Sequence, residues 1–231
     1  MRKNPYKMAA LGVVCTLAAI FYFYAQKQQR METLHMTKAG SKETIVIDPG
    51  HGGFDPGKVG VANSLEKDIN LAIAKLVKTE LETSGYTVYM TREEDSALCT
   101  GNEKSKKLTD MKNRVAFIEE KSPRLSVSIH QNSFSAGTKG AQVFYHAAST
   151  EGKTLAAAIQ QSVREAVGDG NRRVEKANDS YYMLRKVQCP LVIVECGFLS
   201  NPQEEALLLD SSYQKKMAHG ICEGIENFLY K

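Results

Sequence analysis

At residues 45–53 the chain reads Ile-Val-Ile-Asp-Pro-Gly-His-Gly-Gly. The β-branched residues from Thr44 to Ile47 are typical of a buried strand, and the proline and glycines that follow turn the chain. Because glycines flank His51 on both sides, they remove steric bulk and allow positive φ, so the imidazole is presented in the open. Open α/β sheets bind their ligands at the carboxyl ends of strands. His51 is therefore predicted to be the first ligand of a metal site, and the rest of the chain should supply the others.

Strand and helix patterns alternate after this stretch. Apolar residues at helical spacing between Leu65 and Leu81 predict a helix, and Gly85 ends it. The run Leu191–Val194 lacks polar alternation, which is typical of a strand with helices on both faces. Further strands are expected at residues 86–91, 125–129 and 140–145, a short edge strand at 181–184, and further helices at 109–120, 155–167, 202–209 and 212–230. The pattern predicts a single α/β domain with a twisted, mostly parallel but mixed sheet.

The N-terminal segment has a different composition. The run Met8–Tyr24 carries no charge and, as a helix, is about 25 Å long, just short of a bilayer core. A cleaved signal peptide is the alternative, but the run ends in the aromatic cluster Phe21–Tyr24 and has no small-residue cleavage site. We therefore expect residues 1–25 to form an uncleaved transmembrane helix, 26–43 a linker, and 44–231 the α/β domain that carries the site. Three basic residues before the run place the N-terminus in the cytoplasm and the domain outside it.

Charge and cysteine content exclude some classes of function. The formal net charge of the 231 residues is +4, but residues 1–30 hold five basic residues and no acidic one. The remainder has 25 Lys and Arg against 26 Asp and Glu, so it lacks the concentrated basic face that nucleic-acid binding needs. The five cysteines lack the spacing of a metal site. They are interpreted as mostly buried thiols, although a bridge between a strand and a helix stays open.

Glu66 has two interpretations. Asn63 followed by Glu66 fits a capping box, in which the glutamate only closes the start of a helix. In the functional interpretation, the loop after His51 returns this helix start to the same end of the sheet. A carboxylate in that position can bind a divalent cation.

His130 and Glu195 each follow a predicted strand. A histidine there is often a satisfied structural residue and an acid is often solvated, but both occupy the kind of position that His51 does. Asn132 or a backbone carbonyl could fix the tautomer of His130. Burial would raise the pKa of Glu195 towards the range of a general base. Two histidines and one carboxylate leave a fourth zinc position to water or substrate, and a further glutamate nearby completes a metallo-hydrolase.

Four motifs carry a resemblance to a known family. They are Ile47-Asp48-Pro49-Gly50-His51-Gly52-Gly53, Leu65-Glu66-Lys67-Asp68-Ile69-Asn70-Leu71, Ser128-Ile129-His130-Gln131-Asn132 and Val194-Glu195-Cys196-Gly197-Phe198-Leu199-Ser200-Asn201-Pro202. The chain resembles the zinc-dependent N-acetylmuramoyl-L-alanine amidases of the AmiC/CwlV type over residues 44–229. The resemblance implies a six-stranded sheet flanked by helices, Zn²⁺ held by His51, Glu66 and His130, and Glu195 as the catalytic carboxylate.

Some features depart from this family or narrow it. Gln131 stands where a small residue is usual, and Cys196 where leucine is usual. Residues 92–108 are too short and polar for the autoinhibitory helical insert of some members. A membrane anchor followed directly by a catalytic domain resembles the sporulation-linked CwlD type, which helps to make muramic-δ-lactam in spore cortex. The resemblance then implies a location on the cell-wall side of a membrane or in the forespore intermembrane space.

The expected reaction is hydrolysis of the amide between the lactyl group of N-acetylmuramic acid and the L-alanine of the stem peptide, with peptidoglycan as substrate. Asp48 and Asn132 are the candidates for supporting the metal ligands. Two rival functions stay open: a zinc peptidase that cuts within the stem peptide, and a non-catalytic wall-binding module. The sequence also leaves open an activating protein partner without which the site does not hold zinc.

Overall fold

The structure of the protein, a computed structural model, describes residues 22, 26, 43–100 and 105–230. The chain forms two compact units, Met1–Lys42 and Glu43–Lys231. The predicted membrane anchor and linker lie outside the described residues except for the helical residues Tyr22 and Gln26, so the anchor stays a prediction. Among the described helices, none is both long enough and apolar enough to cross a membrane.

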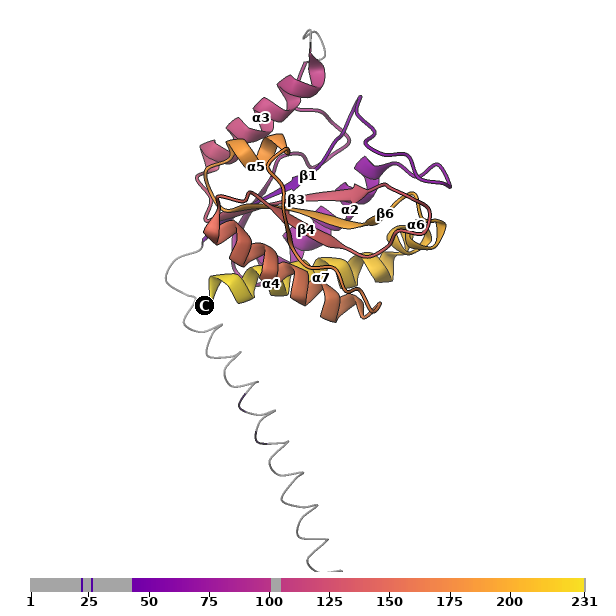
Figure 1. Cartoon of the computed structure of the whole chain (residues 1–231). Helices are drawn as coiled ribbons and strands as arrows, with labels where there is room; N and C mark the ends of the chain where they lie inside the picture. The colour runs from indigo at the N-terminus through magenta and orange to yellow at the C-terminus, as the bar shows by residue number, and fades with distance from the viewer. Residues whose placement is uncertain (1–21, 23–25, 27–42, 101–104, 231) are drawn as a thin grey trace, which may run out of the picture. The chain divides into compact units, whose positions relative to one another are not determined.

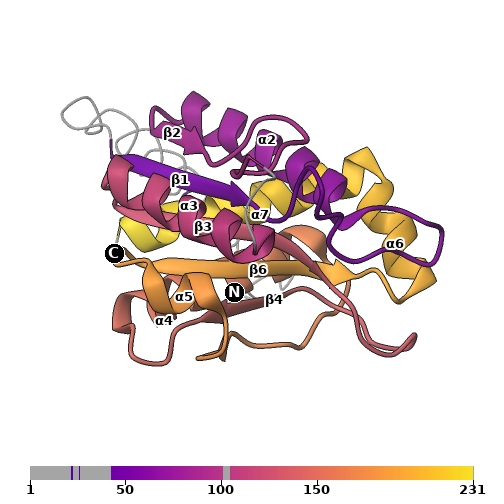
Figure 2. The same cartoon turned by 90° about the horizontal axis from the view of Figure 1, so that it is seen from above.

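The larger unit is built on one six-stranded sheet (Figure 2). Its strands are β1 (Thr44–Pro49), β2 (Thr87–Met90), β3 (Leu125–Asn132), β4 (Gln142–Tyr145), β5 (Lys176–Ala177) and β6 (Leu191–Phe198). The strand order is β2-β1-β3-β6-β4-β5. The first four strands in that order are parallel, whereas β4 is antiparallel to β6 and β5 is parallel to β4. The predicted six-stranded, mostly parallel mixed sheet is confirmed.

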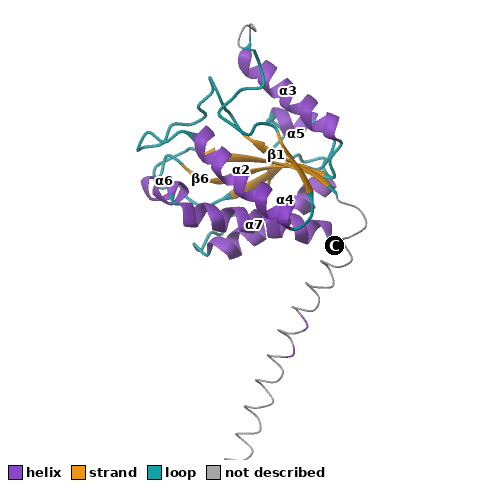
Figure 3. Cartoon of the chain, turned by 180° about the vertical axis from the view of Figure 1, so that it is seen from behind, coloured by secondary structure: helices purple, strands orange, loops and turns teal. Residues whose placement is uncertain are grey.

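Helices cover both faces of this sheet. They are α2 (Glu66–Thr83), α3 (Lys106–Lys121), α4 (Thr150–Val167), α5 (Tyr182–Lys186), α6 (Pro202–Leu209) and α7 (Ser211–Leu229). Helices α4 and α7 lie beneath the sheet and α3 and α5 above it (Figure 1), and the view from behind shows α2 in front of the strands (Figure 3). Ile45 and Ile47 of β1 pack into the core with α2, α4 and α7, whereas Val46 packs into the core with α3 and α5. In the same way, Val192 and Val194 of β6 pack on the first face and Leu191 and Ile193 on the second. Two covered faces thus explain the uninterrupted apolar run at residues 191–194.

The predicted edge strand at 181–184 is wrong. Residues Tyr182–Lys186 form helix α5, and the edge strand is β5 in the preceding loop. The Asn178 side chain accepts hydrogen bonds from the backbone N–H groups of Ser180 at 2.8 Å and Tyr181 at 3.2 Å, and so turns the chain into the helix. The adjacent apolar residues Met183 and Leu184 are both buried in this helix, whereas a two-residue strand is too short to show alternation.

Two central strands extend further than the sequence pattern indicates. Strand β3 continues through His130 to Asn132, and β6 continues through Glu195 to Phe198. His130 and Glu195 are register partners on these neighbouring strands, with an irregularity between His130 and Asn132. The two side chains therefore lie within the sheet rather than in loops after it, and rigid backbone on both sides positions them.

The thiols play no part in a disulfide framework among the described residues. Cys196 and Cys222 are buried and free, and Cys99 and Cys189 are partly buried and free. Cys15 lies outside the described residues.

Candidate metal centre

His51 follows β1 directly and has a left-handed backbone conformation, with φ of 60°. This conformation is costly for a residue with a side chain and persists only where the surroundings hold it. Arg114 of α3 donates hydrogen bonds to the carbonyls of Pro49 at 2.8 Å and His51 at 2.5 Å. Arg92 donates to the carbonyls of Pro49 at 3.0 Å and Gly50 at 3.0 Å. Arg92 and Arg114, which no sequence motif singled out, thus hold the backbone that presents His51.

Gly50 allows the two histidines to approach each other. A Cβ atom at this position would lie 2.1 Å from Cε1 of His130, closer than real Cβ contacts come. The Gly50 N–H donates to the carbonyl of Ile129 at 3.0 Å and ties the loop to β3 beside His130. The absence of a side chain at Gly50, rather than its backbone freedom, is what the site needs.

Glu66 is the first residue of α2, and the capping-box interpretation is wrong. Leu65 occupies the N-cap position, no side chain caps the helix start, and Asn63 has a positive φ of 64°. The Glu66 carboxylate instead accepts hydrogen bonds from the backbone N–H groups of Lys58 at 2.7 Å and Gln131 at 3.0 Å. These bonds, one from the loop before α2 and one from β3, orient the carboxylate into the site.

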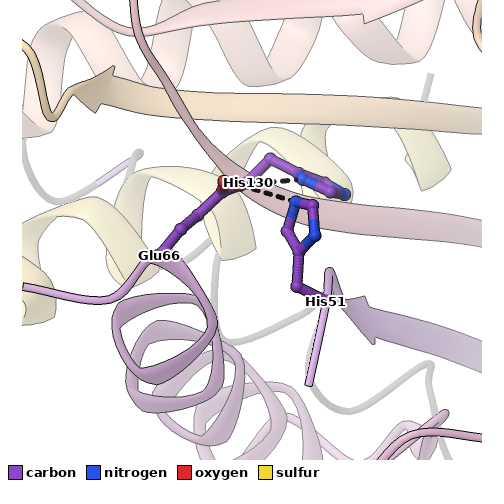
Figure 4. A group of neighbouring side chains, drawn as sticks. All are labelled: His51, Glu66 and His130. Atoms are coloured by element: carbon purple, nitrogen blue, oxygen red, sulfur yellow. Dashed lines mark hydrogen bonds and ion pairs between the residues drawn. The ribbon is translucent and has the colours of Figure 1, made fainter. Parts of the chain in front are cut away.

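The three predicted metal ligands meet at one place (Figure 4). Glu66 Oε1 lies 3.2 Å from Nε2 of His51 and 3.0 Å from Nδ1 of His130. The two imidazole rings are 4.9 Å apart at 78°, and one nitrogen or oxygen of each residue lies within 4.8 Å of the others. In a tetrahedral zinc site, bonds of about 2.05 Å place ligand atoms about 3.3 Å apart. The group has the donor types and spacing to hold one divalent metal ion.

Charges within this group favour an ionised carboxylate. Burial alone would raise the pKa of Glu66, but hydrogen bonds and charges of His130 and His51 hold that pKa far below its ordinary value. Burial lowers the pKa of His130, but the hydrogen bond and charge of Glu66 outweigh it and raise that pKa. A negative oxygen between two nitrogen donors suits a borderline cation such as Zn²⁺.

Glu195 lies beside this group on β6. Its side chain is buried, and Oε2 has no hydrogen-bond partner in the described part of the chain. Burial raises the pKa of Glu195 to about 7; the charge of His130 opposes this rise and the charge of Glu66 adds to it. A carboxylate with this pKa and an unused oxygen can accept a proton at neutral pH.

The predicted supporting residues have other partners. Asp48 pairs with Arg114 at 2.7 Å and accepts hydrogen bonds from Thr91 and Ser128, each at 2.6 Å. Asn132 accepts from the backbone N–H of Ser133 at 2.8 Å. Asp48 is linked to His51 through Arg114, which holds the His51 carbonyl.

On the side of His51 that faces away from Glu66, the contacting side chain is Asp55, with Oδ2 2.9 Å from Nδ1. The sequence reading missed this residue, and its position four residues after a candidate ligand in the same glycine-rich loop was the available signal. Asn70 of α2 also supports the site, since it donates to the carbonyl of Gly50 at 3.1 Å and accepts from the Gln131 amide at 3.1 Å. Gln131 thus braces α2 near Glu66.

The cluster opens into a pocket of about 340 Å³. Its walls include His51, Glu66, His130 and Glu195, together with Tyr181 from the loop before α5. The two histidines keep part of their surface exposed, since each side chain is 22% accessible. A substrate can therefore reach the metal position from solvent, while Glu195 stays buried at the pocket wall.

Comparisons with known proteins give consistent matches. The family model described as N-acetylmuramoyl-L-alanine amidase matches residues 45–227. The germination-specific N-acetylmuramoyl-L-alanine amidase of Bacillus subtilis is 38% identical over 189 residues, which cover 80% of this chain and 79% of that protein. The region that the family model matches, residues 45–227, contains His51, Glu66, His130 and Glu195.

Two solved structures share the fold at substantial identity. The CwlD amidase from Clostridioides difficile, solved in complex with the GerS lipoprotein, is 39% identical with a TM-score of 0.79, over 82% of this chain and 99% of that chain. The catalytic domain of CwlV from Bacillus (Paenibacillus) polymyxa var. colistinus is 32% identical with a TM-score of 0.71, over 81% and 98% of the two chains.

Proposed function

Because the chain belongs to the N-acetylmuramoyl-L-alanine amidase family, we propose that it hydrolyses the amide between the lactyl group of N-acetylmuramic acid and L-alanine in peptidoglycan. The membership confirms the resemblance to AmiC/CwlV-type amidases that the motifs indicate. The observation that carries the proposal is the convergence of His51, Glu66 and His130 from three separate elements of the fold onto one point.

We propose Zn²⁺ as the metal and these three residues as its protein ligands. Two imidazole nitrogens and one carboxylate oxygen are a known donor set of catalytic zinc sites that keep one position open. A bound zinc ion supplies Lewis-acid polarisation of the scissile carbonyl and acidifies water. The chain contributes a carboxylate oriented by two backbone N–H groups, and His51 oriented by the arginine-held loop.

Glu195 is the proposed catalytic carboxylate. As a residue of the pocket wall, its carboxylate accepts a proton from the attacking water and later delivers that proton to the leaving amine of L-alanine. A pKa near 7 favours both transfers, because the group takes up and releases protons at neutral pH. Burial at the pocket wall limits the solvent that competes for this carboxylate.

We propose spore cortex maturation, with formation of muramic-δ-lactam, as the setting of this reaction. Support comes from the germination-specific amidase of Bacillus subtilis and the CwlD amidase, both above 35% identity to this chain. The domain would act outside the cytoplasm, tethered by residues 1–25. The CwlD amidase was solved with a lipoprotein, which supports an activating protein partner for this chain as well.

Product mapping on purified sacculi tests the proposed bond. The full-length protein should release peptides with an intact N-terminal L-alanine and leave peptide-free muramic acid, as read by mass spectrometry. Cleavage within the stem peptide would identify a zinc peptidase instead. Binding to sacculi with no released fragment, in zinc-containing buffer and in cell extract, would favour a wall-binding module and contradict the amidase.

A further inference from the structure

His51 lies between two carboxylates. Its Nε2 is 3.2 Å from Glu66 Oε1, and its Nδ1 is 2.9 Å from Asp55 Oδ2. A neutral imidazole carries one proton, so it donates from one nitrogen and offers a lone pair on the other. An ionised carboxylate only accepts hydrogen bonds, and both nitrogens face one. When a cation lies between His51 and Glu66, Nε2 must offer it the lone pair, so the proton of a neutral His51 lies on Nδ1 and is donated to Asp55.

Asp55 is itself held firmly. Its backbone exchanges two hydrogen bonds with Gly52, at 2.9 Å and 3.1 Å, which closes a tight turn directly after His51. Its second oxygen, Oδ1, accepts from the backbone N–H of Gly57 at 3.3 Å and lies 3.1 Å from Nζ of Lys107. Both oxygens therefore have partners, and the one that faces His51 cannot rotate away without breaking these contacts.

Asp48 cannot perform the same task for His51. Its two oxygens are taken by Arg114, Thr91 and Ser128. His130 has no equivalent carboxylate behind it, because Glu66 is the only carboxylate that contacts it among the described residues. The two histidines are thus supported differently, and only His51 has a carboxylate on the nitrogen that faces away from Glu66.

We propose that Asp55 is a positioning residue that keeps the proton on Nδ1 of His51 and directs the Nε2 lone pair at the metal position. Carboxylate partners of this kind fix ring orientation and raise the basicity of a ligating histidine. This role rests on the metal site of the proposed function. Asp55 should make His51 a stronger ligand and so tighten metal binding.

Zinc affinity of the full-length protein, measured by competition with a chromogenic chelator, tests this role. Replacing such a partner typically weakens metal binding about 10–100-fold, and we expect this range for Asp55→Ala. Asp55→Asn keeps an acceptor oxygen without the charge and should lie between Asp55→Ala and wild type. Lys107→Met is the matched control: it removes the other charged partner of Asp55 and should change the dissociation constant less than threefold.

A second measurement separates positioning from loss of structure. NMR of the zinc-saturated protein should show the Nδ1 proton of His51 shifted far downfield, as in a hydrogen bond to a carboxylate, in wild type and in Lys107→Met. The same proton should move upfield in Asp55→Ala, with the signals of His130 unchanged. Wild-type zinc affinity in Asp55→Ala would overturn this inference alone. Absence of zinc binding in wild type, both alone and in cell extract that can supply a partner protein, would overturn the proposed metal site and this inference with it.

Discussion

At the scale of single residues, the site depends on buried charges that cancel one another. Arg114 donates to the carbonyls on both sides of Gly50 and so holds His51 in its left-handed conformation. Its own charge is balanced by Asp48 at 2.7 Å and Asp110 at 2.6 Å. Breaking a buried pair leaves an uncompensated charge, which costs much more than the pair itself contributes.

The Asp48→Asn substitution should therefore destabilise the protein. We expect a loss of about 3 kcal/mol in the free energy of unfolding, the lower end for a buried pair because Asp110 still faces Arg114. Urea unfolding of the full-length protein measures it. Glu151→Gln removes an exposed partner of Arg124 and should change stability by less than about 0.5 kcal/mol. A loss below 1 kcal/mol for Asp48→Asn would contradict the argument.

The same carboxylate predicts a pH dependence. Burial raises the pKa of Asp48, but Arg114 and three hydrogen bonds outweigh it and lower the pKa to about 2, from an ordinary value of 3.8. Because the folded pKa is the lower one, the stabilisation is present above pH 4 and disappears as pH falls from about 4 to about 2. The shift corresponds to about 2 kcal/mol, and Asp48→Asn should show a correspondingly flatter acid dependence of stability than wild type.

The proposed catalytic role of Glu195 makes a separate prediction. Glu195→Gln keeps size and burial but removes the proton acceptor, so turnover on purified sacculi should fall at least about 100-fold. Zinc content by elemental analysis and thermal stability should match wild type. Near-wild-type turnover with a folded, zinc-loaded variant would remove Glu195 from the mechanism.

At the scale of elements, α4 and α7 approach closely through glycines. A Cβ atom on Gly224 would lie 2.4 Å from Cα of Ile159, and one on Gly220 would lie 2.6 Å from Cα of Val163. Both obstacles are backbone atoms of α4, which cannot move without shifting the helix. This contact fixes the layer of helices under β3 and β6, the strands that carry His130 and Glu195.

We expect Gly224→Ala to destabilise the protein by about 1–3 kcal/mol because it forces the two helices apart. Helix propensity alone predicts the opposite sign, since alanine is favoured over glycine by about 1 kcal/mol within a helix. Gly137→Ala is the control, because a Cβ there meets nothing within 4 Å. Urea unfolding decides between the two effects, and a stabilised Gly224→Ala variant would show that the close contact does not matter.

At the scale of the whole molecule, the sheet joins segments that are far apart in the chain. Strands β1 and β3 are adjacent and parallel, so His51 and His130 come to the same edge of the sheet, and α2 returns Glu66 to it. A ligand that binds this assembled site but not the unfolded chain must stabilise the fold.

Zinc should therefore raise the melting temperature of the metal-free, full-length protein. At 100 times its dissociation constant the gain is about 2.7 kcal/mol, or about 5–10 °C for a domain of this size. Mg²⁺ at the same concentration should have little effect, because it prefers six oxygen ligands. An equal zinc-induced shift in His51→Ala would mean that the ion binds elsewhere.

Local sequence determined the buried first strand, the mixed α/β sheet and the identity of four residues that meet in one pocket. It could do so because burial, turns and strand ends leave short-range patterns around His51, His130 and Glu195. Only the tertiary structure decided that Glu66 faces the histidines rather than capping its helix, that Asp55 rather than Asp48 contacts His51, and that residues 182–186 are helical. Those outcomes depend on partners such as Arg114 and Gln131, which lie more than sixty residues from the groups they orient. Sheet register brings such partners together, and no pattern within one segment of the chain encodes that meeting.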